Sequence, residues 1–153
     1  MRLRTLASTT LLASLFAASA IAADGSPVGT WKSIDDATGE PKALIEISER
    51  DGTLEGRIVE LFRKPGEEPN PLCTQCSDER KDQPIVGMTI LTGLRPDGPE
   101  WSNGMILDPK NGKVYRAKAS LSDDGQSLNV RGYLGMAMFG RTQVWQRQPD
   151  AAE

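Results

Sequence analysis

Histidine is absent from this chain of 153 residues, and cysteine occurs only twice. Without histidine, the chain has no Ser-His-Asp or Cys-His catalytic arrangement and no zinc site that includes an imidazole. The phosphate-binding pattern Gly-x-x-x-x-Gly-Lys is also missing, which removes the commonest nucleotide-binding loop. An enzyme is therefore the least favoured class of function for this sequence.

Carboxylates remain available for acid/base chemistry. Glu46, Glu60 and Asp108 lie on predicted strands or at their ends, and a glycosidase-type pair would need two of them face to face at a set separation. Asp108 has a simpler explanation, because Asp-Pro begins the turn that Asn111 and Gly112 complete. No catalytic residue, metal ligand or cofactor is predicted.

Long apolar runs are missing from the chain except at its N-terminus. Arg2 and Arg4 precede an uncharged, mostly apolar stretch at residues 6–18, and Ala-Ile-Ala at residues 20–22 supplies a small-x-small cleavage site. This arrangement predicts a secretory signal peptide at residues 1–22. The stretch is shorter than the ~20 residues of a membrane span, so a retained anchor is the weaker alternative and no span is expected after processing.

The bacterial type of this signal peptide predicts a periplasmic protein, with full secretion as the alternative. Neither cysteine lies near the cleavage site, so a lipoprotein is not expected. Removal of residues 1–22 leaves 16 basic against 21 acidic residues, a net charge of −5. Nucleic acids bind through clustered cations, and this acidic balance argues against a nucleic-acid partner.

The mature chain, residues 23–153, has the size of one domain, and no repeat or linker divides it. Short stretches that alternate apolar and polar residues, or are rich in β-branched residues, are separated by turn-forming residues, and no window shows a helical stripe. Predicted strands lie at residues 28–34, 42–48, 53–62, 85–94, 103–107, 113–121, 127–134 and 139–147. The core of the domain therefore spans about residues 28–147.

Four connections between these strands carry recognisable turn chemistry. Residues 50–52, 96–98, 111–112 and 123–125 supply Asp-Gly or Asn-Gly, which tolerate positive φ and form hairpin turns. Eight strands joined mainly by short turns predict an all-β, antiparallel up-and-down barrel, because closure removes the unpaired edges of an open sheet. An open sandwich of the same strands is the alternative.

Gly29-Thr30-Trp31, at the start of the first predicted strand, resembles the Gly-x-Trp entry of lipocalin-type barrels. In those barrels the tryptophan closes the floor, and an arginine from the end of the chain packs across it. The resemblance implies structural roles for Trp31 and for Arg147 or Arg141, with Trp145 nearby on the last strand. An ordinary buried tryptophan would show the same short motif, and the strand count favours the barrel.

A longer resemblance covers nearly the whole mature chain. It rests on motifs at residues 29–31, 73–76, 108–115, 131–135 and 139–147, of which the last reads Phe-Gly-Arg-Thr-Gln-Val-Trp-Gln-Arg. In these motifs the chain resembles the bacterial exported family catalogued as domain of unknown function 2147. The resemblance implies a periplasmic location and a lipocalin-like β fold, and it brings no activity, substrate or catalytic residue.

The pair Cys73 and Cys76 has three interpretations. A structural disulfide is favoured, because disulfides persist in oxidising compartments and this one would hold the long, proline-rich stretch at residues 63–84. A redox motif would be expected at the start of a helix in a βαβ unit, and no helical pattern follows. A metal site would require more ligands than the chain offers here.

The segment at residues 131–147 places apolar side chains in a predicted turn, where polar ones would be usual. Such a turn either folds inward as a plug or forms a rim of the barrel mouth, and methionine suits both an adaptable ligand surface and irregular core gaps. If Arg141 points inward, it needs an anionic partner, either a carboxylate of the protein or the acid group of a ligand. The predicted ligand-binding residues are Arg131, Tyr133, Met136, Met138, Phe139 and Arg141.

Two classes of function follow from these features. The preferred one is a periplasmic module that binds a small apolar or amphipathic molecule inside the barrel. The other is a protein-interaction or inhibitor-type module that inserts the disulfide-tied loop at residues 63–84 into an envelope partner. An accessible interior cavity favours the first, and a filled interior with a rigid, protruding loop favours the second.

Overall fold

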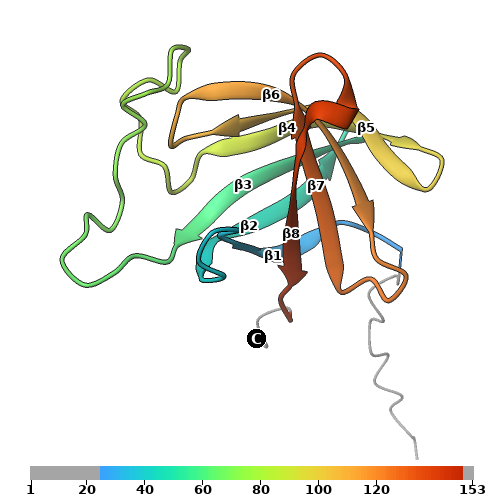
Figure 1. Cartoon of the computed structure of the whole chain (residues 1–153), viewed down its shortest axis with the longest axis horizontal. Coiled ribbons are helices and arrows are strands. Elements are labelled where there is room, and N and C mark those ends of the chain that lie inside the picture. The colour runs from blue at the N-terminus through green and yellow to red at the C-terminus, as the bar shows by residue number, and fades with distance from the viewer. Residues whose placement is uncertain (1–24, 150–153) are drawn as a thin grey trace, which may run out of the picture.

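Alternating apolar and polar residues form eight antiparallel strands that close into one barrel in a computed structural model, which describes residues 25–149 (Figure 1). Each strand pairs with its neighbours in chain order, and β8 returns to β1. The strands are β1 (Gly29–Ile34), β2 (Pro41–Arg50), β3 (Thr53–Leu61), β4 (Thr89–Asp97), β5 (Glu100–Asp108), β6 (Lys113–Leu121), β7 (Ser127–Tyr133) and β8 (Arg141–Arg147). The predicted up-and-down barrel is confirmed, and the open sandwich is not formed. The predicted signal peptide at residues 1–22 lies outside the described residues.

Strand boundaries differ from the prediction mainly around the longest connection. Residues 85–88 were expected to open the fourth strand, but β4 begins only at Thr89. The amide of Met88 donates to the carbonyl of Ile85 at 3.1 Å, and Gly87, at a φ of 92°, donates to Ile58 at 2.7 Å. These residues therefore form a turn that is bound to β3 through Gly87 and through Met88, whose carbonyl accepts from the amide of Ile58 at 3.0 Å.

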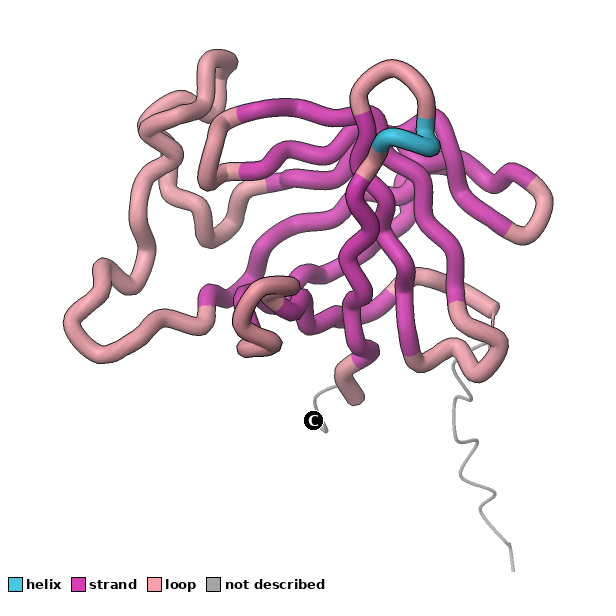
Figure 2. The backbone as a smooth tube through the Cα atoms, in the orientation of Figure 1, coloured by secondary structure: helices cyan, strands magenta, loops and turns pink. Residues whose placement is uncertain are grey.

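The start of the last strand also differs. Residues 137–139 form a short 3₁₀ turn, η1 (Ala137–Phe139), and the strand begins at Arg141. Figure 2 shows this turn as the only helical segment among the described residues, on the side of the β7–β8 connection that leads into β8.

The two ends of the barrel differ in their connections. One end, called the closed end here, carries the short β2–β3, β4–β5 and β6–β7 turns. The other, called the open end, carries the connections at residues 35–40, 62–88, 109–112 and 134–140 (Figure 1). The longest loop, at residues 62–88, extends beside the β5–β6 hairpin in that view.

Trp31 and Arg147 form the floor at the closed end. Trp31 is fully buried, and its indole Nε1 donates to the carbonyl of Pro27 at 2.8 Å. The guanidinium carbon of Arg147 lies 4.3 Å from the centroid of the Trp31 ring, a cation–π arrangement. The same guanidinium donates to the carbonyls of Ser26, Gly125 and Val28. The arginine that covers the tryptophan is thus Arg147 and not Arg141.

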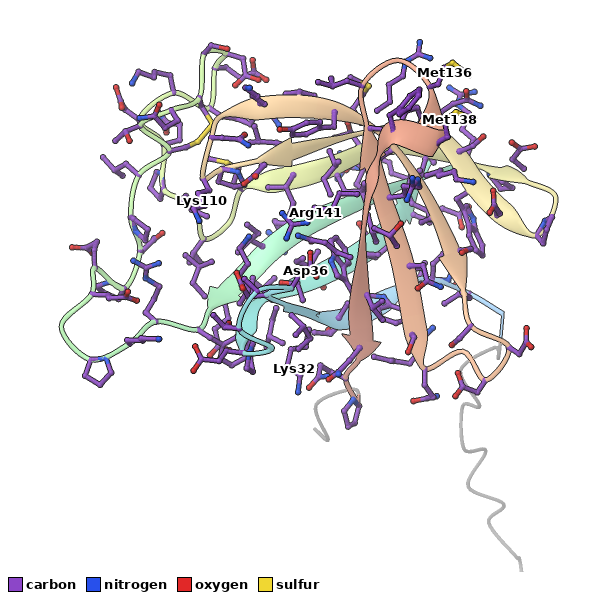
Figure 3. All side chains as sticks on the ribbon, in the orientation of Figure 1. Lys32, Asp36, Lys110, Met136, Met138 and Arg141 are labelled. Carbon is purple, nitrogen blue, oxygen red and sulfur yellow. A yellow bond between two sulfur atoms is a disulfide. The ribbon has the colours of Figure 1, made fainter. Side chains whose placement is uncertain are left out.

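Closure between β1 and β8 is short. The two strands pair only through Trp31–Arg147, Lys32–Gln146 and Ser33–Trp145. Nearer the open end than these pairs, Arg141 reaches the β1–β2 connection and binds Asp36, with Nη2 2.6 Å from the carboxylate (Figure 3). The Asp36–Arg141 ion pair therefore joins β8 to the β1–β2 connection beyond the last hydrogen-bonded pair of β1 and β8.

The disulfide-tied loop packs against the β5–β6 turn. Cys73 and Cys76 form a disulfide, and both are buried. The amide of Cys73 donates to Gln83 at 2.8 Å, and that of Ile85 donates to Pro71 at 3.0 Å, so the two sides of the loop are joined. The predicted disulfide is confirmed. Thiol exchange requires access to a sulfur atom, so the burial supports a structural role.

Gly112 marks the point where this loop meets the barrel. Its φ is 69°, and a Cβ atom placed there would lie 1.8 Å from the carbonyl oxygen of Gln75. We expect Gly112→Ala to destabilise the protein by clearly more than the cost of positive φ alone, which is about 1–2 kcal/mol. Chemical denaturation measures this, with Gly98→Ala as the control, because Gly98 has a φ of 60° and open space around it. Equal losses in both variants would show that the loop does not pack here.

Candidate functional site

A cavity of about 980 Å³ occupies the half of the barrel nearer the open end, and its mouth lies at that end. Its inner wall is apolar because the inward-facing positions of the strands carry aliphatic side chains. The floor formed by Trp31 and Arg147 closes the barrel at the opposite end. The apolar wall residues include Ile45, Ile58, Ile90, Ile106, Val130 and Trp145.

Two polar side chains interrupt the apolar wall on the neighbouring strands β1 and β8. Ser33 is buried, and its hydroxyl donates to the carbonyl of Ala43 at 3.3 Å. The oxygen Oε1 of Gln143 accepts from the indole Nε1 of Trp145 at 3.2 Å, which orients the amide. Within residues 25–149 the amide nitrogen of Gln143 has no hydrogen-bond partner, so this half-buried side chain has a free donor for a ligand oxygen.

Charged side chains of both signs surround the mouth of the cavity. Most are paired, as in Arg63–Glu67 at 3.5 Å and Lys64–Glu40 at 3.3 Å. Lys42 and Lys110 also line the mouth, and neither has an ion-pair partner in the described part of the chain. Figure 3 shows Lys110 at the open end, apart from the Asp36–Arg141 pair.

Asp35 lines the mouth of the cavity where β1 leads into the β1–β2 connection. Backbone hydrogen bonds from the amides of Thr38 and Ala37 hold the pKa of Asp35 below its usual value. These bonds, at 3.0 and 2.9 Å, form the Asx turn that joins β1 to β2. Asp35 therefore shapes the rim and stays charged through the neutral pH range.

The predicted ligand-binding residues divide into two groups. Tyr133, Phe139 and Arg141 line the cavity mouth, whereas Arg131, Met136 and Met138 do not. Arg131 holds the β7–β8 connection instead: its guanidinium donates to the carbonyls of Ala137 and Met138 and to the hydroxyl of Thr142. The anionic partner of Arg141 is a carboxylate of the protein, that of Asp36.

The β7–β8 connection does not plug the barrel. Leu134, Met136, Met138 and Phe139, called the apolar tip here, are 62%, 60%, 68% and 77% exposed. The plug interpretation is therefore wrong, because Arg131 binds the loop carbonyls and the tip stands at the rim with its side chains in solvent. In Figure 3 Met136 and Met138 lie at the outer edge of the barrel, away from Arg141.

Two of the three carboxylates considered for acid/base chemistry, Glu46 and Asp108, have structural partners. Glu46 pairs with Arg57 at 2.9 Å on the exposed surface. Asp108 accepts from the amide of Lys110 and the side chain of Asn111, so it shapes the β5–β6 turn as the turn interpretation predicts. Residues 25–149 contain no group of three His, Cys, Asp or Glu side chains that could hold a metal ion. No helix within this range has the length and apolar character to cross a membrane.

Comparison with known families decides the assignment of the chain. A model of the family described as "Uncharacterized protein conserved in bacteria (DUF2147)" matches residues 29–147, from the first residue of β1 to the last residue of β8. The chain belongs to this family. The resemblance found in the sequence motifs is thereby confirmed.

The DUF2147 chain also resembles a solved structure. Protein HP1028 from the human pathogen Helicobacter pylori, described as belonging to the lipocalin family, aligns with a TM-score of 0.70 at 16% identity. The alignment covers 82% of this chain and 84% of that one. At this identity the likeness establishes the fold, and the expected lipocalin-like barrel is confirmed. A search of curated proteins gave no match for the DUF2147 chain.

Proposed function

We propose that this protein binds one small apolar or amphipathic molecule in the barrel cavity and that it works in the periplasm. The cavity of about 980 Å³, with an apolar wall and one open end, is the observation that carries the proposal. Ligand pockets for small molecules usually enclose about 300–1,000 Å³ and combine apolar walls with a few polar groups. The lipocalin-like barrel is a fold compatible with this use.

The wall chemistry indicates how such a molecule would lie. Its apolar part would be buried against wall residues that are only partly buried, such as Leu61 and Ile106, with a gain of about 25 cal/mol for each Å² of apolar surface removed from water. A polar oxygen would accept from the free amide of Gln143 or remain at the charged mouth. An amphipathic molecule satisfies both parts of the site, because its polar end is not buried without a partner.

The periplasmic location rests on two features. The N-terminal residues have the pattern of a signal peptide, and the Cys73–Cys76 disulfide is stable in an oxidising compartment. Fractionation of cells that express the full chain tests this part of the proposal. A protein that keeps residues 1–22 and stays in the cytoplasm would contradict it.

A protein-interaction or inhibitor role for the loop at residues 63–84 is the second candidate. The observation that favours it is the order of this loop, which is tied by the disulfide and packed at Gly112. Loss of partner capture after replacement of the exposed Leu72 by serine tests this role. The accessible cavity favours small-molecule binding over this alternative.

Titration with N-phenyl-1-naphthylamine, an apolar dye that fluoresces in apolar surroundings, tests the binding proposal. We expect a saturable rise in fluorescence with one dye molecule per protein, because the proposal places the ligand in the barrel cavity of about 980 Å³. A long-chain fatty acid and its methyl ester then compete for the site and show whether a charged end matters. A fluorescence rise that does not saturate, or that equals that of the unfolded protein, would contradict an enclosed site.

A further inference from the structure

The apolar tip is fixed in its exposed position. Three hydrogen bonds from Arg131, two to loop carbonyls and one to Thr142, hold the connection at both sides. Gly140 allows the chain to turn back closely, since a Cβ atom there would lie 2.5 Å from the carbonyl oxygen of Gly132. Four large apolar side chains kept in solvent by such specific contacts indicate a binding surface, because isolated soluble domains rarely expose apolar patches of this kind.

The charge around the apolar tip differs from that of the rest of the protein. Residues 131–141 contain two arginines and no acidic residue, in a chain with more acidic than basic residues, and Arg141 pairs with Asp36. Arg131 lies on β7, just before the apolar tip, and Arg141 is the first residue of β8, just after the tip. Arg116, which is exposed on β6, lies opposite Tyr133 in the register of β6 and β7 and is therefore beside the apolar tip. Neither Arg116 nor Arg131 has a carboxylate partner within residues 25–149.

An apolar cluster with a cationic collar has the chemistry of a surface that binds anionic lipids. Apolar side chains enter the boundary between headgroups and acyl chains, while arginines bind the lipid phosphates. The flexible methionines suit this medium, because it offers no shaped groove. We propose that the apolar tip docks the barrel onto an anionic phospholipid surface.

Docking at the tip would bring the cavity to the lipid surface. Leu134 and Phe139 belong both to the apolar tip and to the mouth of the cavity. Met136 and Met138 belong only to the tip, so lipid docking and cavity binding are separable by mutation. The docking proposal goes beyond ligand binding and does not depend on it.

Co-sedimentation with vesicles tests the docking proposal. The protein, beginning at residue 23 so that the apolar N-terminus does not contribute, is mixed with vesicles of phosphatidylcholine and phosphatidylglycerol or of phosphatidylcholine alone. The test variant is Met136→Ser with Met138→Ser. The matched control is Val59→Ser with Val144→Ser, which removes two exposed apolar side chains outside the tip. Melting temperatures of all proteins establish that the barrel stays folded.

We expect the wild-type protein and the control to bind the mixed vesicles, and we expect the affinity of the tip variant to be at least about tenfold lower. Arg116→Gln should weaken binding about fivefold, and added salt should remove the preference for the anionic lipid. Dye binding in the cavity should be unchanged in the tip variant. No binding to mixed vesicles, or equal losses in tip variant and control, would overturn the proposal. A protein partner captured through the tip, without vesicle binding, would also overturn it.

Discussion

Replacement of Trp31 by alanine is expected to lower the free energy of unfolding by about 3–5 kcal/mol, the usual cost of removing a buried large aromatic side chain. The side chain is fully buried at the closed end, and its loss also removes the hydrogen bond to Pro27 and the face on which Arg147 packs. Urea denaturation of the two proteins measures the difference.

Trp101→Ala serves as the control for that experiment. Trp101 is only partly buried and packs at the edge of the core, so its loss should cost less. Similar losses for both tryptophans would show that Trp31 is an ordinary core residue without a special role in the floor. A second variant, Arg147→Gln, should show an intermediate loss, because the indole stays in place while its cover is reduced.

Introduction of phenylalanine at Gly132 is expected to abolish most ligand binding. Gly132 lies on β7 at the cavity wall, and a Cβ atom there would meet Ile106 and Tyr115 at ordinary distances of 3.4 and 3.6 Å. The backbone therefore accepts a side chain, and a phenyl ring would extend into the cavity. We expect dye affinity to fall at least about tenfold, a loss of about 1.4 kcal/mol or more.

Gly132→Ala is the matched control for the cavity. It adds one methyl group at the same position and leaves most of the cavity volume free, so dye affinity should stay close to wild type. Both variants should retain the barrel, which circular dichroism and melting temperature verify. Unchanged affinity in Gly132→Phe would place the dye outside the cavity and contradict the proposed site.

Most of the barrel could be predicted from the sequence because its signals are local. Asp-Gly and Asn-Gly turns mark the hairpins, and alternation along the strands marks the inward face, as at Ala43, Ile45 and Ile47 on β2. The boundary near Thr89 was missed because apolar residues 85–88 resemble a strand, whereas their hydrogen bonds depend on contacts with β3.

The site was only partly predictable, since it depends on contacts between distant residues. Asp36 and Arg141 are 105 positions apart, and no local pattern indicates that they pair. Gln143 shares a face with Trp145 by the period of two, and this was the one signal available for the inner polar group. Met136 and Met138 are apolar residues of the type that fills protein cores, and only the structure shows that Arg131 holds their loop with both side chains in solvent.

Native mass spectrometry of the protein purified gently from cells that express the full chain tests whether the barrel cavity holds a ligand. We expect a reproducible extra mass that is lost on denaturation and is absent from Gly132→Phe, on a chain two hydrogens lighter because Cys73 and Cys76 are oxidised. A chain without extra mass that also forms no complex with excess dye would contradict a ligand-binding cavity.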